Sequence, residues 1–323
     1  YGVSNSGNIT AGSQGTAIYS QGGNINLTSG TVSVGSNSGV GVYTAGNGQT
    51  VTAGAGSNMI IGADSFGFSN VGQGSHIISN INSVDLNDSS IYVYSRDNTG
   101  TVDNYTKLTA VGTSGDNYGI YSAGTVNNHA DMDLRNGIGN VGIYSINGGT
   151  AKNLGGTITV GDSDVPNSRY SIGMAAGYQN SDTGNVINNG TIKVQEKEGI
   201  GMFATGHGSK AINYGNIHLQ NESAIGMYLD RGAIGENWGT IEGNAQSLKG
   251  VVAINGGYIK NYGHINVTGS GSNGIVTDGS RFIVDASGNP VEVLQSTDPR
   301  YTSSAAVTAG QTNRKDGPDL YGG

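Results

Sequence analysis

A five-residue phrase of the form Asn-x-Gly-x-Ile occurs four times in the second half of the chain, and it limits the possible folds more than any other feature. It occupies residues 188–192, 213–217, 237–241 and 261–265. The isoleucines that end the phrase are spaced 25, 24 and 24 residues apart, at Ile192, Ile217, Ile241 and Ile265. Self-similarity at a fixed period of about 20–50 residues is typical of a stacked repeat fold.

The same period continues towards the N-terminus. Before Ile192 the column resumes after a longer gap of 34 residues, with Ile158, Met132, Leu108 and Val84 at spacings of 26, 24 and 24 residues. At a looser spacing, candidate earlier members are Ile60, Val32 and Ile9. The column predicts about eleven copies of one repeat between residues 1 and 280.

Each copy holds three short runs with the signals of β-strands. The first alternates apolar and polar residues, as at 191–194, the second is of the type seen at 199–203, and the third ends in Asn, as at 210–213. The runs are rich in β-branched residues and are bounded by Gly, Asn or Ser. They predict an all-β fold, a right-handed parallel β-helix of about eleven turns of ~24 residues with three short strands per turn.

The composition agrees with this fold and excludes several classes of function. The chain has 323 residues, of which 58 are glycine, and it has no cysteine. Many glycines without a collagen period, combined with regular aliphatics, favour a turn-rich β fold. The lack of cysteine excludes a disulfide scaffold and thiolate metal sites. A net charge of −8 argues against a nucleic-acid partner, and no apolar stretch is long enough to predict a membrane-spanning helix.

The repeat pattern stops at Arg281, which divides the chain into two parts. Residues 1–280 form the predicted β-helix segment, and residues 281–323 form a non-repeat appendage. Within the appendage, two β-type runs flank a turn signal at 286–290 and predict a hairpin, followed by an irregular tail. The chain begins at Tyr1 without a signal peptide and ends in two glycines. We therefore expect it to be a fragment of a longer protein.

One repeat is longer than the others. Ile158 and Ile192 are separated by 34 residues, and the excess includes residues 162–170 and 179–184. Insertions in a solenoid become loops on its side and often carry the binding function, although such a loop can also be merely tolerated. The charged and aromatic side chains of the first insertion, Arg169 and Tyr170, are therefore candidate ligand-binding residues.

Aromatic residues recur at two positions of the repeat. Tyr214, Trp238 and Tyr262 follow the Asn of the phrase on three successive turns, where we expect the Asn to point inward and the ring outward. Exposed rings suit contact with sugar rings or protein side chains, so these three residues are candidate ligand-binding residues. The alternative is that stacked rings only shield and stabilise the sheet.

The second aromatic position directly follows the apolar residue that we expect to point inward in the second run. Its members are Tyr19, Tyr43, Tyr94, Tyr121, Tyr144, Phe203 and Tyr228, and the copies at Ala175 and Val252 interrupt it. A column of asparagines is also predicted, with its members at Asn128, Asn188, Asn213, Asn237 and Asn261. Stacked amides can bond to one another and fix the register. Asn153 comes one residue early, which predicts a bulge near 155–156.

Signals of catalysis are weak. Residues 137–142 match the dinucleotide-binding fingerprint, but a β-type run follows where the mechanism needs a helix. Lys193, His218 and Glu242 occupy the same outward position on successive turns, where an acid–base site is conceivable and a solvated face with modest charge pairing is more usual. We expect no enzymatic activity, no cofactor and no metal. A polysaccharide-active β-helix lyase or hydrolase is the alternative.

The phrases Asn-x-Gly-x-Ile and Ile-Gly-Met-Tyr, repeated in an acidic, cysteine-free chain, resemble the passenger domains of large autotransporter adhesins of Gram-negative bacteria, the long fusobacterial adhesins in particular. The resemblance covers roughly residues 1–280. It implies an extracellular, monomeric shaft held at the outer membrane by a C-terminal barrel outside this sequence. It also implies attachment to a protein or glycan on host cells or other bacteria. No adhesive residue carries over, and a trimeric phage tailspike is a further alternative.

Overall fold

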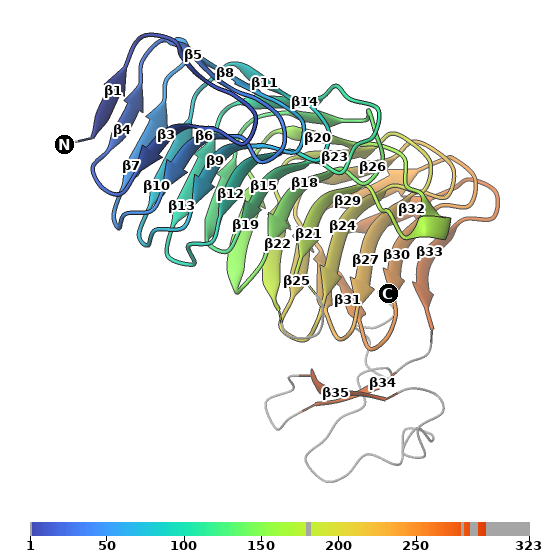
Figure 1. Ribbon diagram of the computed structural model, residues 1–323. Helices are drawn as coiled ribbons and strands as arrows, with labels where there is room; N and C mark the ends of the chain where they lie inside the picture. The colour runs from blue at the N-terminus through green and yellow to red at the C-terminus, as the bar shows by residue number, and fades with distance from the viewer. Residues whose placement is uncertain (1, 179–181, 279–280, 285–289, 295–323) are drawn as a thin grey trace.

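The computed structural model describes residues 2–178, 182–278, 281–284 and 290–294. Within residues 2–278 the chain forms a three-sided coil in which parallel strands of successive turns stack side by side (Figure 1). Each side carries eleven strands. This confirms the predicted all-β parallel β-helix of eleven turns with three strands per turn.

The strands of the three sides follow the three runs of the repeat. Face 1, which carries the Ile phrase, consists of a three-stranded and an eight-stranded sheet, formed by β2 (Ile9–Ala11), β5 (Gly30–Val34), β8 (Ser57–Ile61), β11 (Ser83–Leu86), β14 (Lys107–Ala110), β17 (Met132–Leu134), β20 (Thr157–Val160), β23 (Thr191–Val194), β26 (Asn216–Leu219), β29 (Thr240–Gly243) and β32 (His264–Val267). Face 2 is one sheet of β3 (Thr16–Ser20), β6 (Val40–Thr44), β9 (Phe66–Asn70), β12 (Ile91–Ser95), β15 (Tyr118–Ser122), β18 (Val141–Ser145), β21 (Ile172–Ala176), β24 (Ile200–Thr205), β27 (Ile225–Asp230), β30 (Lys249–Ala253) and β33 (Asn273–Thr277). Face 3 is one sheet of β1 (Val3–Asn5), β4 (Ile25–Leu27), β7 (Thr50–Ala53), β10 (His76–Ser79), β13 (Thr101–Asn104), β16 (Thr125–Asn128), β19 (Gly149–Asn153), β22 (Gly184–Asn188), β25 (Lys210–Asn213), β28 (Ile234–Asn237) and β31 (Tyr258–Asn261).

The interior is a set of aliphatic columns that run along the coil axis. On face 1, Ile192 pairs with Ile217, Ile217 with Ile241, and Ile241 with Ile265. The first three are fully buried, and Ile265 packs against the core from a partly buried position. Met202 and Met227 stack in the same way on face 2 and are also fully buried. Both stacks were predicted, and each buried side chain stabilises the coil by about 1.5–3 kcal/mol.

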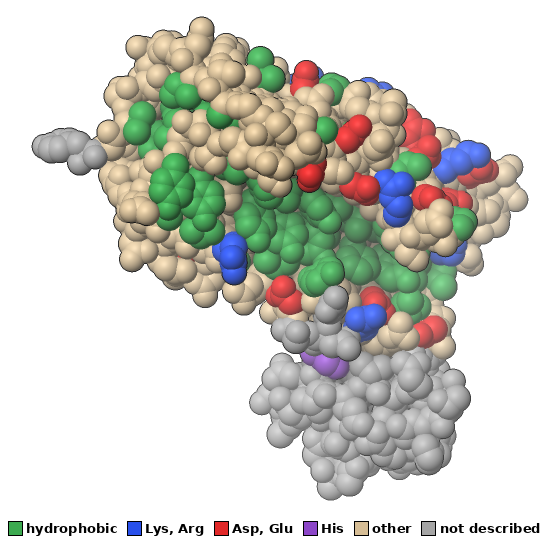
Figure 2. Space-filling view, in the orientation of Figure 1, with side chains coloured by type: hydrophobic (Ala, Val, Ile, Leu, Met, Phe, Trp, Pro, Cys, Tyr) green, Lys and Arg blue, Asp and Glu red, His purple; other side chains and the backbone are tan. Residues whose placement is uncertain are grey.

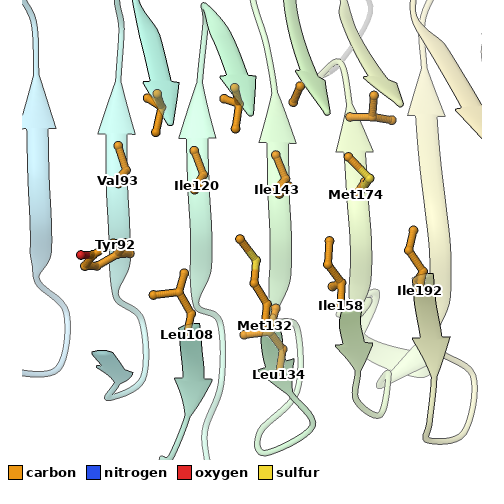
Figure 3. Close-up of a cluster of buried hydrophobic side chains, with 14 of the residues drawn as sticks. Tyr92, Val93, Leu108, Ile120, Met132, Leu134, Ile143, Ile158, Met174 and Ile192 are labelled. Atoms are coloured by element: carbon orange, nitrogen blue, oxygen red, sulfur yellow. The ribbon is translucent and has the colours of Figure 1, made fainter. Parts of the chain in front are cut away.

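Two of these columns are visible in Figure 3, where the inward side chains of neighbouring turns lie one beside the other. The face 2 column in that view holds Val93, Ile120, Ile143 and Met174, and the face 1 column holds Leu108, Met132, Ile158 and Ile192.

The prediction for Ile60 is wrong. Met59, not Ile60, pairs with Val32 in the face 1 column. Met59 is 4% exposed and Ile60 is 58% exposed. Successive side chains of a strand point to opposite faces, so an offset of one residue moves Ile60 from the interior to the outer surface.

The asparagine column is longer than predicted. The side chains of Asn104, Asn128, Asn153, Asn188, Asn213, Asn237 and Asn261 form a continuous ladder, in which each Nδ2 donates to the next Oδ1 at 2.9–3.1 Å. The extra residue that follows Asn153 lies near 155–156, as predicted, but in a turn and not in a strand bulge, because β19 pairs with both neighbours in regular register. The extra residue is accommodated in the turn after the strand, where Gly155 has a φ of 154°.

The two irregular parts of the chain differ from the coil. The first insertion contains a single turn of 3-10 helix, η1 (Val165–Asn167). Beyond the coil, β34 (Arg281–Val284) and β35 (Pro290–Leu294) pair antiparallel, as expected for a hairpin. Residues 179–181 of the second insertion, the hairpin turn at 285–289 and the expected irregular tail at 295–323 lie outside the described residues. No helix in the described part of the chain is long and apolar enough to cross a bilayer.

Candidate functional site

Three exposed aromatic rings form a ladder on the turns that connect face 3 to face 1. We call Tyr214, Trp238 and Tyr262 the aromatic ladder; the three side chains are 50%, 48% and 53% exposed. The ring centroids of Tyr214 and Trp238 are 6.4 Å apart, those of Trp238 and Tyr262 are 4.1 Å apart, and both pairs are stacked at 22°. The predicted outward orientation is confirmed.

The buried asparagine ladder explains why these rings align. The residue after each Asn begins the turn, and its backbone N–H donates to the carbonyl of the Asn one turn earlier. This bond is 2.8 Å long for Tyr214, for Trp238 and for Tyr262. The backbone of the three turns is therefore held in one register, and the rings project from it at a regular spacing.

The same turn position carries other exposed groups earlier in the chain. Tyr105 follows Asn104 and stacks on His129 with centroids 4.4 Å apart and an interplanar angle of 1°. Leu154 and Asn189 occupy the position on the next two turns. These two residues interrupt the stacking, so this turn position carries two separate aromatic stacks along the coil.

The first insertion folds back over face 2 instead of projecting into solvent. Arg169 holds it there: its Nη2 donates to Oδ2 of Asp116 at 2.8 Å and to the backbone oxygens of Ser114 at 3.0 Å and Ile138 at 3.3 Å. These acceptors belong to the two preceding turns. Tyr170, which follows directly, is 37% exposed. The two candidate residues of the insertion therefore have different roles, because Arg169 is a tether and Tyr170 presents a ring.

A groove lies between this insertion and the outer surface of face 2. It has a volume of about 410 Å³, and we call it the aromatic groove. Figure 2 shows the apolar side chains that gather along this side of the coil. The lining residues are Asp116, Tyr118, Gly139, Val141, Tyr144, Ser168, Arg169, Tyr170, Ile172, Ile200, Phe203, Tyr228 and Asp230.

The floor of the groove is made by two outward columns of face 2. One column contains Val141, Ile172 and Ile200, and the other contains Tyr121, Tyr144, Ala175, Phe203 and Tyr228. The predicted aromatic column and its interruption at Ala175 are thus confirmed. The groove itself was not predicted. One feature of the sequence could have indicated the groove: the aromatic column is interrupted, at Ala175, in the same repeat that carries the insertion.

The tyrosine hydroxyls beside the groove remain protonated at neutral pH. Burial raises the pKa of Tyr121 to about 12, helped by the neighbouring Tyr94 and Tyr118. Burial is also the main cause that raises the pKa of Tyr118, Tyr144 and Tyr228. Tyr144 donates its hydroxyl to the backbone oxygen of Gly177 at 2.8 Å. The tyrosine rings that line the groove are thus uncharged at neutral pH.

The polar column of face 1 has the predicted order. Lys193 pairs in register with His218, and His218 with Glu242. Nδ1 of His218 lies 3.0 Å from Oε1 of Glu242 at the edge of an open, polar groove of about 380 Å³. No group of three metal-binding side chains occurs among the described residues.

The fingerprint at residues 137–142 leads into a strand. β18 begins at Val141, inside the matched letters, so no helix N-terminus follows the glycines. The nucleotide-binding mechanism requires such a helix, and the match is therefore accidental, as the sequence indicated.

One family model matches the chain, and it is described as the BigA third pectate lyase-like domain. The match covers residues 1–240 and ends in β29. No curated protein and no solved structure matches the chain significantly. Because the family match spans well over half of the sequence and all of the aromatic groove, the chain belongs to the family of the BigA third pectate lyase-like domain, a passenger-like β-helix domain of bacterial surface proteins.

Proposed function

We propose that this chain is a shaft segment of an autotransporter-type adhesin on the bacterial cell surface, and that it contacts host cells or other bacteria through the aromatic ladder. The observation that carries the proposal is the stack of three half-exposed rings, Tyr214, Trp238 and Tyr262. The partner is a surface protein or glycan. The family supports a surface location.

The ladder has the properties of an interface anchor. Binding energy concentrates in a few aromatic or Arg side chains, and exposed Gly, Ser, Thr and Asn contribute little. The rings are already ordered by stacking and by the turn backbone, so little conformational entropy is lost when a partner covers them. Trp238 lies at the centre of the three and contacts both neighbours. It is therefore the expected energetic centre.

A cell-binding assay with a double variant tests the proposal. Trp238→Ala combined with Tyr214→Ala should weaken attachment at least about tenfold, the effect of losing one anchor of about 1.4 kcal/mol or more. Circular dichroism confirms folding. The matched control is Tyr105→Ala, which removes a ring at the same turn position from the other stack. Full attachment by the folded double variant would exclude the aromatic ladder as the contact surface.

The rival function is a polysaccharide lyase or hydrolase at the His218–Glu242 groove. Glycosidases as a rule use two carboxyl groups that flank the scissile bond. Glu242 supplies the single carboxylate among the described side chains that line this groove. We therefore propose that the chain has no such activity. A screen on neutral and acidic polysaccharides tests this, and turnover that disappears in Glu242→Gln or His218→Ala would establish the enzyme instead.

We also propose that the shaft is monomeric. Sedimentation of the chain at micromolar concentration measures this directly. A trimer would instead favour the tailspike alternative, in which three coils associate along their length.

A further inference from the structure

We propose that the aromatic groove on face 2 is a second binding site, separate from the aromatic ladder, and that its ligand is an uncharged glycan segment whose sugar rings stack on Tyr118, Phe203 and Tyr228. The groove lies on a different side of the coil from the ladder, which occupies the turns between face 3 and face 1. The proposal therefore does not depend on the adhesive role of the ladder.

The aromatic rings stand in two groups at the two ends of the groove. Tyr118 and Tyr144 form one group, with centroids 5.8 Å apart, and Phe203 and Tyr228 form the other, with centroids 5.6 Å apart. β21 runs between the strands of the two groups and carries Ala175 in the aromatic column. The groups are therefore separated by two strand spacings, roughly 10 Å. An extended ligand with more than one ring can reach both.

The accessible apolar surface of the groove is aromatic. The aliphatic floor is almost fully covered, with Val141 4%, Ile172 9% and Ile200 2% exposed. In contrast, Tyr118, Phe203 and Tyr228 are only partly buried, and Tyr170 is 37% exposed. A ligand thus meets ring faces, which suit the apolar face of a sugar, and finds no open aliphatic pocket for a branched side chain.

The charges at the rim are paired inside the protein, which favours an uncharged ligand. At one end, Asp116 is neutralised by Arg169 at 2.8 Å. At the other end, Asp230 lies 3.5 Å from Nε of Arg231 and accepts a hydrogen bond from Nδ2 of Asn255 at 2.8 Å. A charged sugar would have to lose hydration without a free counter-charge to replace it. The paired groups still offer oxygens that can accept from sugar hydroxyls.

The wall of the groove is fixed before a ligand arrives. The three hydrogen bonds of the Arg169 guanidinium hold residues 168–170 over face 2. Ser168 and Gly139 line the groove from the insertion and from the coil, and both have left-handed backbone, with φ values of 55° and 79°. A few polar groups around a mostly apolar groove orient a ligand, while the rings supply the contact area.

Titration of the full chain with defined oligosaccharides tests the proposal. The probes are neutral hexasaccharides of glucose with β-1,4 and with α-1,4 linkages, and an oligogalacturonate of the same length as the acidic comparison. Isothermal titration calorimetry measures binding. We expect saturable binding of at least one neutral probe and much weaker binding of the acidic probe.

Variants locate the binding. Phe203→Leu combined with Tyr228→Leu keeps the apolar cover of the sheet but removes two rings, and it should weaken binding at least about tenfold. The matched control is Tyr19→Leu with Tyr43→Leu, which removes a stacked pair from the same column at the other end of the coil. This control and the Trp238→Ala, Tyr214→Ala variant should bind as the parent does.

The proposal would be overturned by no binding of either neutral probe, by binding that the folded Phe203→Leu, Tyr228→Leu variant retains in full, or by tighter binding of the galacturonate. Loss of binding in the Trp238→Ala, Tyr214→Ala variant would assign the sugar to the ladder instead. If the leucine variant fails to fold, Arg169→Gln takes its place, since it releases the groove wall and leaves the rings intact.

Discussion

Nδ2 of Asn188 donates a hydrogen bond of 2.9 Å to Oδ1 of Asn213, the equivalent residue one turn later. Both side chains are completely buried. The same Nδ2 also reaches the carbonyl oxygen of Gly190 at 3.2 Å, so it holds its own turn as well as the next one. An amide is suited to this position because it carries a donor and an acceptor on one planar group.

Replacing one amide should therefore damage two turns at once. Asn213→Ala leaves Asn188 without its acceptor and Asn237 without its donor, since the bond from Asn213 to Asn237 is also 2.9 Å long. Each buried group left unsatisfied costs about 1–3 kcal/mol, so we expect a loss of about 2–4 kcal/mol in the free energy of unfolding. Urea denaturation measures it. Asn216→Ala, at an exposed side chain three residues away, is the control, and an equal loss there would contradict the ladder's role.

On eight of the eleven strands of face 2, a glycine lies too close to the next turn to accept a side chain without a shift of its neighbours. A Cβ on Gly201 would lie 2.6 Å from the carbonyl oxygen of Gly226 and 2.9 Å from Cγ2 of Ile217. Gly201→Ala must push neighbouring turns apart, and we expect a loss of about 1–3 kcal/mol by analogy with overpacked cores. Thermal unfolding measures the effect.

Gly22→Ala is the matched control for that experiment. No atom lies within 4 Å of a Cβ at Gly22. The substitution should be neutral or slightly stabilising, because alanine restricts the unfolded chain. If the two alanine variants unfold at the same temperature, close packing between turns is not what selects glycine at position 201.

The repeat made most of the coil predictable. Every turn must present an aliphatic side chain inward on each face. The spacing of Ile192, Ile217 and Ile241 was therefore sufficient to predict which residues pair between neighbouring strands. The failures have a local cause. Met59 and Ile60 are adjacent and both apolar, and the loose spacing of the early repeats does not decide between them. The bulge predicted near 155–156 is instead a longer turn, because the extra residue follows the strand that ends at Asn153.

The aromatic groove could not be predicted in the same way. It depends on which direction an irregular segment takes, and that is decided by single contacts such as the one between Arg169 and Asp116, 53 residues apart. No period in the sequence links those two positions. The aromatic ladder, by contrast, follows from one turn position repeated three times, and the sequence was sufficient to find it.

One buried tyrosine should make the coil sensitive to alkali. Tyr92 points inward on β12 and is fully buried (Figure 3). Its hydroxyl lies 2.6 Å from Oγ of Ser79. Burial raises the pKa of Tyr92 from 10.0 to about 12, against the smaller opposite effect of hydrogen bonds with Ser79 and Thr106. The folded state therefore keeps the proton longer than the unfolded state does.

The stability of the coil should therefore fall as the pH rises above about 10. Below pH 10 Tyr92 is neutral in both states, and its contribution to stability is constant. Between about pH 10 and 12 only the unfolded state ionises, so the free energy of unfolding falls, by about 2–3 kcal/mol for this residue. Tyr92→Phe should be about 1 kcal/mol less stable at pH 7 but should lose less stability up to pH 12. Urea unfolding at both pH values checks this, and parallel curves for parent and variant would contradict it. Tyr262→Phe, on an exposed ring, should follow the parent.

The tether of the first insertion should control the order of that segment. Arg169→Gln removes the ion pair with Asp116 and at least one of the two bonds to backbone oxygens. Both charged side chains are partly exposed, so the pair itself contributes only about 0.2–1 kcal/mol, and global stability should change little. Hydrogen exchange is the sensitive measurement. The amides of Ser168, Arg169 and Ser171, which bond within the insertion, should exchange faster in the variant.

The control for this tether is Arg135→Gln. Arg135 makes a comparable pair with Asp133, 2.8 Å long, but the two residues are only two positions apart and hold no separate segment. Its removal should leave exchange in the insertion unchanged. Exchange in the turns that carry Tyr214 and Trp238 should be the same in both variants, because the asparagine ladder holds those turns. If Arg169→Gln leaves exchange at residues 168–171 as slow as in the parent, the insertion is held by its apolar contacts with face 2 and Arg169 is not its tether.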